Sequence, residues 1–452
     1  MAMFHTRGRL GLALLAMAAF ALPVFGQIAV RNQGYVPFSE EPIAYRGDVD
    51  DPVARLQRRL DRGEVTLGYE PKNGYLKAVL DALEIPVSSQ TLVFSKTSFQ
   101  YKKISPQTPR ALYFNDDVYV GKVHDGKAIE LVSFDARQGA IFYLLDEQRA
   151  ERPSFQRAEL DCTQCHVAAG TRGVPGVLLR SIFPTASGTQ APQTASYVTG
   201  HQSPWSERWG GWYVTGTHGT SQADMGNALV LDRERPEELD RRDAANVVDL
   251  SKRFDTSPYL SGDSDIVAHL VLAHQTQMHN LITLTNYQTR LALYAEAQRN
   301  TAVEQPGTKL SDAARAQYER PAEELVRYLL FADEAALDGP VTGTSSFAKD
   351  FAALGVRDAS GRSLRDFDLR TRTFKYPCSY LIYSEDFDAL PEPARSYVFR
   401  RLLEVLSGRD TSPEFAKLSA ADRRAILEIL LATKKGLPAD WKADEKNSHD
   451  VG

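Results

Sequence analysis

The stretch "ALYFNDDVYVGKVHDGKAIELVSFDARQGAIFYLLD", residues 111–146, indicates the fold of the N-terminal half. It contains four runs rich in β-branched and aromatic residues, separated by the polar sequences NDD, HDGK and RQG. Apolar runs bounded by Asp, Asn and Gly are typical of antiparallel strands joined by tight turns. Together with "TLVFS" at 91–95, they predict a β-rich region over residues 27–149.

The second half of the chain has the pattern of helices. Residues 263–298 continue for more than thirty positions without Gly or Pro, and Asp263 or Ser264 is suited to cap the start of that helix. The spacing of Ser419 and Asp422 is that of a capping box. Further helices are expected at 51–63, 321–335, 392–408 and 419–438.

These patterns predict an α+β protein with several regions. A signal peptide is expected at 1–26, a β-rich region at 27–149, a loop-rich region at 150–260, a mainly helical region at 261–440 and a polar tail at 441–452. The chain of 452 residues is long enough for two or three packed units. Its net charge of −5, without a long run of one sign, gives no electrostatic footprint for nucleic-acid binding.

The first 26 residues have the features of a bacterial export signal. Arg7 and Arg9 precede an apolar run from Leu10 to Leu22, and the small residue Gly26 follows. The apolar run is shorter than the roughly 20 residues that a spanning helix needs, so cleavage near Gly26 is expected rather than anchoring. We therefore expect a periplasmic protein with no transmembrane helix in the mature chain.

The sequence "LDCTQCHVAAG", residues 160–170, contains Cys162, Cys165 and His166 in the pattern C-x-x-C-H. This is the attachment signature of c-type haem. The two thiols add to the two vinyl groups of haem, and the adjacent imidazole binds the iron. A chance match is improbable because only 3 Cys and 9 His occur in the chain. A redox-active thiol pair and a zinc site are the alternatives, and no second C-x-x-C is present to complete a zinc site.

The motif resembles that of c-type cytochromes. The segments "LYFNDDVYVGKV", "GVPGVLLRSIF", "RWGGWYVTGTHG" and "KYPCSYLIYS" are in addition similar to large exported bacterial proteins described only as cytochrome c domain proteins. That resemblance implies one covalent haem c, with its iron, at Cys162, Cys165 and His166. It implies no established activity, and the chain is much longer than ordinary small cytochromes.

The sixth iron ligand is expected downstream of the motif. Met225 lies in a Gly-containing segment 59 positions after His166 and is, with Met278, one of two methionines outside the signal sequence. It is the first choice, ahead of His218 and His274, with His201 also open. An ordinary apolar Met in a turn is the alternative.

Other residues near the motif have both structural and functional interpretations. The tryptophans could form a local aromatic core, line the haem or relay an electron, and the arginines could pair with haem propionates or lie on the surface. These residues are Trp205, Trp209 and Trp212, and Arg172, Arg180 and Arg208.

The long helix carries His269, His274 and His279. Spacings of five place successive members about 140° apart, so hydrogen-bonded core histidines are expected rather than a metal site. Residues 115–117 are expected to form a polar turn, with a calcium site as the weaker alternative. Cys378 is expected to be a buried structural thiol.

Two functional classes follow from these expectations. The first is an exported monohaem c-type cytochrome that transfers electrons to or from a redox partner protein. The second is a haem-dependent oxidoreductase, peroxidase-like, with an open distal site, although a two-haem peroxidase would need a second C-x-x-C-H. A module in which haem is mainly structural is a third and weaker interpretation.

Overall fold

The computed structural model describes residues 36–219, 224–302 and 310–441. The expected signal peptide at 1–26 lies outside this part of the chain, as does the expected tail except for its first residue, Trp441. Trp441 is fully buried and packs in the helical half.

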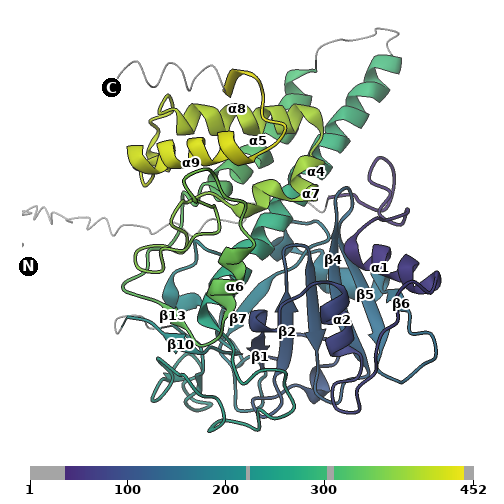
Figure 1. Ribbon diagram of the computed structural model, residues 1–452, viewed down its shortest axis with the longest axis vertical. Coiled ribbons are helices and arrows are strands. Elements are labelled where there is room, and N and C mark those ends of the chain that lie inside the picture. Colours follow the sequence, from purple (N-terminus) through teal and green to yellow (C-terminus); the bar gives the residue numbers. More distant parts are fainter. Residues whose placement is uncertain (1–35, 220–223, 303–309, 442–452) are drawn as a thin grey trace, which may run out of the picture.

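An antiparallel sheet of seven strands forms the N-terminal half (Figure 1). Its strand order is β6-β5-β4-β3-β2-β1-β9, so the sequence-adjacent strands from β1 to β6 form a meander. The five runs predicted from the sequence correspond to β1 to β5. The strands are β1 (Thr91–Val93), β2 (Arg110–Phe114), β3 (Val118–Lys122), β4 (Ala128–Asp135), β5 (Gly139–Asp146), β6 (Phe155–Arg157) and β9 (Trp212–Tyr213).

Both faces of the sheet are covered by helices. Phe142 pairs with Val132 across β4 and β5, and Phe134 lies two residues along on the same face, because side chains alternate between faces along a strand. This face packs against helix α4 (Ile266–Ala302) in the larger hydrophobic core. The opposite face packs against α1 (Pro52–Asp61) and α2 (Leu76–Ala82) in a second core.

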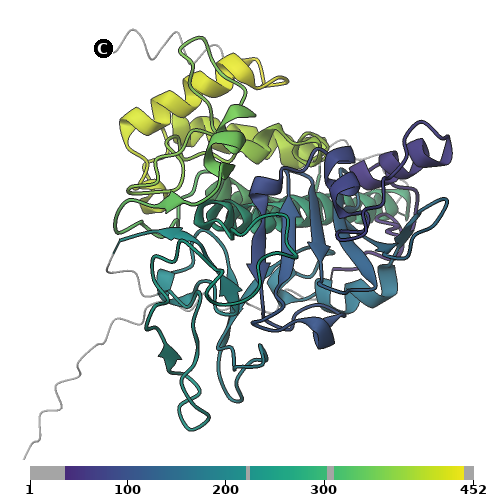
Figure 2. The ribbon, with the colours of Figure 1, turned by 60° about the horizontal axis from the view of Figure 1, so that its bottom comes forward.

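Helix α4 connects the sheet to the helical half. Figure 2 shows it crossing behind the sheet, and residues from Ile266 to Leu284 are almost completely buried. The remaining helices are α5 (Asp312–Leu329), α6 (Phe347–Ala353), α7 (Glu385–Asp388), α8 (Glu392–Leu406) and α9 (Ala420–Thr433). The molecule is therefore α+β, with strands in the first half and helices in the second, and one hydrophobic core joins the two.

Residues 150–260 form mostly loops and short elements. Helix α3 (Glu159–His166) carries the C-x-x-C-H motif, and the hairpin of β7 (Leu179–Ile182) and β8 (Ser196–Thr199) follows it. Three two-residue strands, β10 (Gly216–Thr217), β11 (Leu229–Val230) and β12 (Leu239–Asp240), complete this region, with β10 paired to β13 (Thr342–Gly343).

The element boundaries differ from the sequence prediction at several helices; α9, for example, ends at Thr433 and not at 438. Helix α4 is capped by Asp265, not by Asp263 or Ser264: its Oδ1 accepts hydrogen bonds from the backbone N–H groups of Val267 and Ala268, at 2.7 and 3.4 Å. Helix α5 starts at Asp312, well before the expected residue 321, because the Ser311 side chain caps it there, and Pro321 lies inside the helix. The predicted capping box of Ser419 and Asp422 is present at the start of α9.

Within the described ranges, none of the helices combines the length and the apolar character needed to span a membrane.

Candidate functional site

Helix α3 places the three motif residues together. Cys162 and Cys165 lie one turn apart, which puts them on the same side of the helix, and His166 ends it. Cys165 is exposed, whereas Cys162 is partly buried against the larger core. None of the three described cysteines forms a disulfide. The Cys165 thiol therefore lies at the surface, whereas the core covers part of Cys162.

The His166 ring is fixed through one of its two nitrogens. Its Nδ1 donates a hydrogen bond of 2.8 Å to the carbonyl of Gly176, and the ring packs against Phe142 of β5 with centroids 4.9 Å apart. No hydrogen bond involves Nε2 among the described residues, so its lone pair is available. Metal-binding histidines usually donate their second ring N–H to a backbone carbonyl or a carboxylate, and this arrangement matches that of an axial iron ligand.

The protonation state of His166 also suits a ligand. Burial lowers its pKa, and its hydrogen bond to Gly176 opposes this effect only in part. The charge of Arg110 lowers the pKa further, and that of Glu130 raises it. The ring is therefore neutral at pH 7, which is the form that binds a metal.

Helix α4 positions the segment that holds His166. The side chain of Asn280 donates to Val177 O at 2.7 Å and accepts from Val177 N at 3.1 Å. A β-carbon on Gly176 would overlap Asn280 Oδ1, so this close approach requires glycine. The amide of Gly176 also donates to His166 O at 3.0 Å. Motif, loop and α4 thus form one hydrogen-bonded unit.

Sequence reasoning did not identify Gly176 or Asn280. The signal for Gly176 is its place in "RGVPGV", ten residues after His166, where repeated Gly and Pro indicate a tight turn beside the motif. Asn280 carries no comparable signal, because its partner lies 103 positions away in the chain.

Met225 lies on the far side of the β7–β8 hairpin from the motif. Its sulfur accepts a hydrogen bond from Ser181 Oγ at 3.6 Å on the inner, buried face of β7. On the outer face, Val198 and Leu178 approach Gly170, close after the motif: a β-carbon on Gly170 would lie 3.1 Å from a methyl group of each. The hairpin therefore separates Met225 from the motif loop.

Two of the alternative histidines, His274 and His218, have protein partners on both ring nitrogens, and His201 has one on Nδ1. His274 contacts His201 Nδ1 through Nδ1 at 2.8 Å and Ser379 Oγ through Nε2 at 2.7 Å. His218 contacts the carboxylate of Asp224 at 3.3 Å and the carbonyl of Gly219 at 3.1 Å. Burial lowers the pKa of His274 to about 3 and that of His201 well below its usual value. His274 and His201 are therefore neutral, as expected of core histidines.

The three neighbouring tryptophans belong to the larger core. Trp205 and Trp209 contact edge to face with centroids 5.0 Å apart, and Trp212 forms part of strand β9. His269 lies between Trp209 and Trp212, at 6.0 and 5.4 Å from their rings. The expected local aromatic core is confirmed.

The three arginines have different surroundings. Arg172 pairs with Glu324 at 2.8 Å. Arg208 is buried, where it donates to the carbonyls of Ser203 and His201 and burial lowers its pKa to about 10. Arg180 is exposed on the outer face of β7. Of the three, Arg180 is the one available to an added anionic group.

A buried charged cluster joins the β2–β3 turn to the helical half. His279 donates from Nδ1 to Asp386 at 3.0 Å and from Nε2 to Asp116 O at 2.8 Å, so its ring carries both protons. Burial acts to lower the pKa of His279, but the hydrogen bond and charge of Asp386 outweigh it and leave the pKa raised. Burial raises the pKa of the nearby Asp117 to about 7, and the charge of Asp386 contributes.

The same turn has the predicted polar form. The Asn115 side chain accepts hydrogen bonds from the amides of Asp117 and Val118 and donates to Leu83 O. In the described part of the chain, no group of three or more His, Cys, Asp or Glu side chains is arranged to hold a metal ion. Neither the calcium nor the zinc alternative gains support from these side chains.

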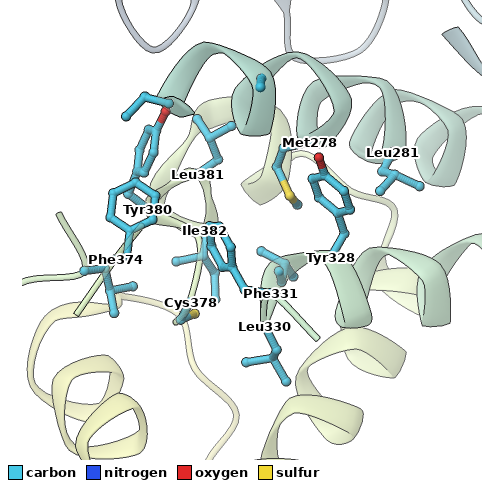
Figure 3. Close-up of a cluster of buried hydrophobic side chains, with 14 of the residues drawn as sticks. Met278, Leu281, Tyr328, Leu330, Phe331, Phe374, Cys378, Tyr380, Leu381 and Ile382 are labelled. Carbon is cyan, nitrogen blue, oxygen red and sulfur yellow. The ribbon is translucent and has the colours of Figure 1, made fainter. Parts of the chain in front are cut away.

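Cys378 is a buried thiol, as predicted. Figure 3 shows it beside Phe331, Leu330 and Ile382, and burial raises its pKa to about 12. It belongs to the packing of the helical half, and its surroundings offer no role in redox chemistry.

Comparisons with known proteins give no further guide, since no family model, no curated protein and no solved structure matches this chain.

Proposed function

We propose that this protein is an exported, periplasmic monohaem c-type cytochrome that transfers electrons to or from a partner protein. Haem is covalently attached at Cys162 and Cys165, with His166 as an axial ligand of the iron. The observation that carries the proposal is the hydrogen bond from His166 Nδ1 to Gly176 O, which leaves Nε2 available on the helix end that also carries Cys162 and Cys165. Haem iron supplies one-electron redox chemistry when bound.

The protein's contribution to this function is positioning and electrostatics. The carbonyl of Gly176 orients the imidazole. Its hydrogen bond also makes Nε2 a more basic ligand, which would donate more electron density to the iron. Phe142 covers one side of the His166 ring, which is partly buried. Because Phe142 and Val177 both belong to the larger core, the groups that hold the His166 ring are fixed in place.

The hydrogen bonds and contacts made by the candidate sixth ligands favour a second function, a haem-dependent oxidoreductase with an open distal site. Met225, His218 and His274 all have their donor atoms engaged with protein groups. If none of them binds the iron, the sixth position is left to water or a small oxidant. In the electron-transfer proposal Met225 would have to leave Ser181 to reach the iron.

Covalent attachment is tested on the denatured protein. Haem should stay with the chain through acidic acetone extraction, and Cys162→Ala or Cys165→Ala should reduce its retention. Cys378→Ser is the matched control and should retain haem at the wild-type level, because Cys378 is buried away from the surface. Loss of all haem from the wild-type protein on extraction would contradict the proposal.

The two functions are separated by the visible spectrum with and without cyanide or carbon monoxide. Six-coordinate, low-spin iron that binds neither cyanide nor carbon monoxide supports electron transfer. Ready binding of either ligand supports the open distal site. If Met225 is the sixth ligand, Met225→Ala should convert the first behaviour into the second, and an unchanged spectrum in that variant would exclude Met225.

A further inference from the structure

A groove with a positively charged lining lies between the segment after β1 and the outer face of β7. It has a volume of about 690 Å³ and is lined by Lys96, Lys102 and Arg180 together with hydroxyl, amide and apolar side chains. Among the described residues that line it, none is acidic. The volume is in the range of small-molecule sites.

The two walls of the groove are fixed to each other. The amide of Lys96 donates to Gly188 O at 3.1 Å, which joins the first wall to the turn that forms the second. Gly188 has a φ of +81°, and a β-carbon there would overlap Phe94 O, so the turn approaches this closely only with glycine. Ser187 and Thr189, whose hydroxyls are 3.1 Å apart, belong to this turn. The groove is therefore built before any ligand arrives.

The three cations lack acidic partners. Arg180, Lys96 and Lys102 form no ion pair with any residue that the structure describes, and the Lys96 ammonium donates only to a backbone carbonyl, at 3.2 Å. The neighbouring Arg110, by contrast, pairs with Glu130 at 2.6 Å. Three like charges around one groove repel each other, and an anionic ligand relieves that repulsion.

The groove shares one face of the β7–β8 hairpin with the side chain that contacts the segment after the motif. Arg180 pairs directly with Val198 across β7 and β8, so both side chains lie on the same face of the hairpin. Val198 on this face approaches Gly170, four residues after His166, and its side chain is 37% exposed. The face that carries Arg180 thus combines an apolar surface beside the motif with a cation at the groove.

We propose that this groove is a carboxylate-binding site and that its ligands are the two propionates of the haem attached at Cys162 and Cys165. The inference rests on the proposed function for the source of the carboxylates. The apolar outer face of the hairpin, with Leu178 and Val198, would cover part of the porphyrin, while Arg180, Lys96 and Lys102 bind its charged edge. A free di- or tricarboxylate offers the same chemistry and is the competing source.

The test compares two triple variants of the haem-loaded protein. Lys96→Gln/Lys102→Gln/Arg180→Gln removes the groove charges, and Arg152→Gln/Lys252→Gln/Arg370→Gln removes three exposed charges elsewhere. The reduction potential is measured against pH, and far-UV circular dichroism confirms folding. Opposite charges lower a carboxyl pKa by about 1 to 3 units, so the propionate-linked step should move up by about one unit or more in the groove variant only. Arg180→Gln alone should give a smaller shift in the same direction.

Citrate binding measured by calorimetry distinguishes the sources. If the propionates occupy the groove, citrate should not bind the wild-type protein. Citrate binding that is lost in the groove variant, with no change in the pH step, would overturn the haem as the source and leave a site for a free carboxylate. No shift and no citrate binding would overturn the site itself. If the protein carries no covalent haem but binds citrate through these residues, the proposed function fails and the carboxylate site stands.

Discussion

The carbonyl of Gly176 accepts the hydrogen bond that holds the His166 ring, so a side chain at position 176 should disturb the proposed iron site. In Gly176→Ala the new methyl group would collide with Asn280 Oδ1, and overpacking of this kind costs about 1 to 3 kcal/mol of folding free energy. As the carbonyl moves away, the imidazole would donate less electron density to the iron. The reduction potential of the haem should therefore rise. Gly262→Ala, where a β-carbon meets nothing within 4 Å, should change neither quantity.

The His279–Asp386 pair is a second residue-level feature with a measurable effect. Asp386→Asn removes the carboxylate and leaves a buried histidinium without its counter-charge, which should lower the free energy of unfolding by about 3 to 5 kcal/mol. The adjacent Glu385 makes an exposed pair with Arg55, so Glu385→Gln should change stability by less than about 1 kcal/mol. Urea denaturation measures both. Equal effects of the two substitutions would contradict the assigned charge on His279.

The pKa of Asp117 predicts a pH dependence of stability. Asp117 releases its proton near pH 4 when the chain is unfolded and at about 7 in the folded protein. Between these values the folded state binds more protons, so this group makes the free energy of unfolding fall as pH rises from about 4 to 7. Asp386, whose pKa is lowered, has the opposite effect at lower pH. Because wild type and an Asp117→Asn variant both contain Asp386, its effect cancels when the two are compared.

Asp117→Asn should remove this contribution. The stability of the variant relative to wild type should increase from about pH 4 to pH 7 and stay constant above that, because Asn does not titrate. Asp125→Asn changes a carboxylate that is 76% exposed and is the matched control. A difference between Asp117→Asn and wild type that does not vary with pH would show that Asp117 has an ordinary pKa in the folded state.

At the scale of elements, the start of α4 links the sheet to the helical half. Asp265 caps the helix through Oδ1, and its Oδ2 accepts hydrogen bonds from the backbone amide and hydroxyl of Ser345, each at 2.8 Å. Asp265→Ala should therefore lower the free energy of unfolding by about 2 to 3 kcal/mol, since it removes a cap and leaves buried donors unpaired. Ser419→Ala, at the more exposed start of α9, should lower it by about 1 kcal/mol.

Whether a sequence prediction succeeded depends on how far apart in the chain the interacting residues lie. Strands β1 to β5 were predictable because alternating apolar runs and turn residues are local signals. The edge strand β9 was not predictable, because two residues in a loop-rich segment become a strand only by pairing with Leu92 and Val93. Asp263 and Ser264 both have side chains that can cap a helix, yet Asp265 is the residue that caps α4. Its other carboxylate oxygen contacts Ser345, 80 positions away, and the local sequence does not indicate this contact.

The same distinction holds for the candidate site. Cys162, Cys165 and His166 lie within five residues of one another, so their spacing is a local signal from which covalent haem attachment can be predicted. The surroundings of Met225, by contrast, depend on which face of β7 Ser181 occupies. That face is fixed by the packing of the hairpin on the larger core, which no local pattern specifies. The surroundings of a proposed distal ligand are therefore the part of this site that a single sequence predicts least well.

At the scale of the whole molecule, the larger core includes both sheet and helices, so the two halves should unfold together. Trp205, Trp209 and Trp212 report on the edge of the sheet, whereas Trp441 packs against Phe399 in the helical half. In Trp441→Phe, urea transitions followed by fluorescence and by far-UV circular dichroism should share one midpoint. Two separate midpoints would show that the halves are independent domains.

The order of the strands has a consequence for incomplete chains. β9 covers the free edge of β1, but it lies 119 positions after Val93 in the chain, beyond the C-x-x-C-H motif. Until Trp212 and Tyr213 arrive, the edge of β1 presents unpaired backbone groups of the kind that recruit strands from other molecules. A chain truncated between the motif and residue 212 should therefore aggregate, because it lacks the strand that covers this edge.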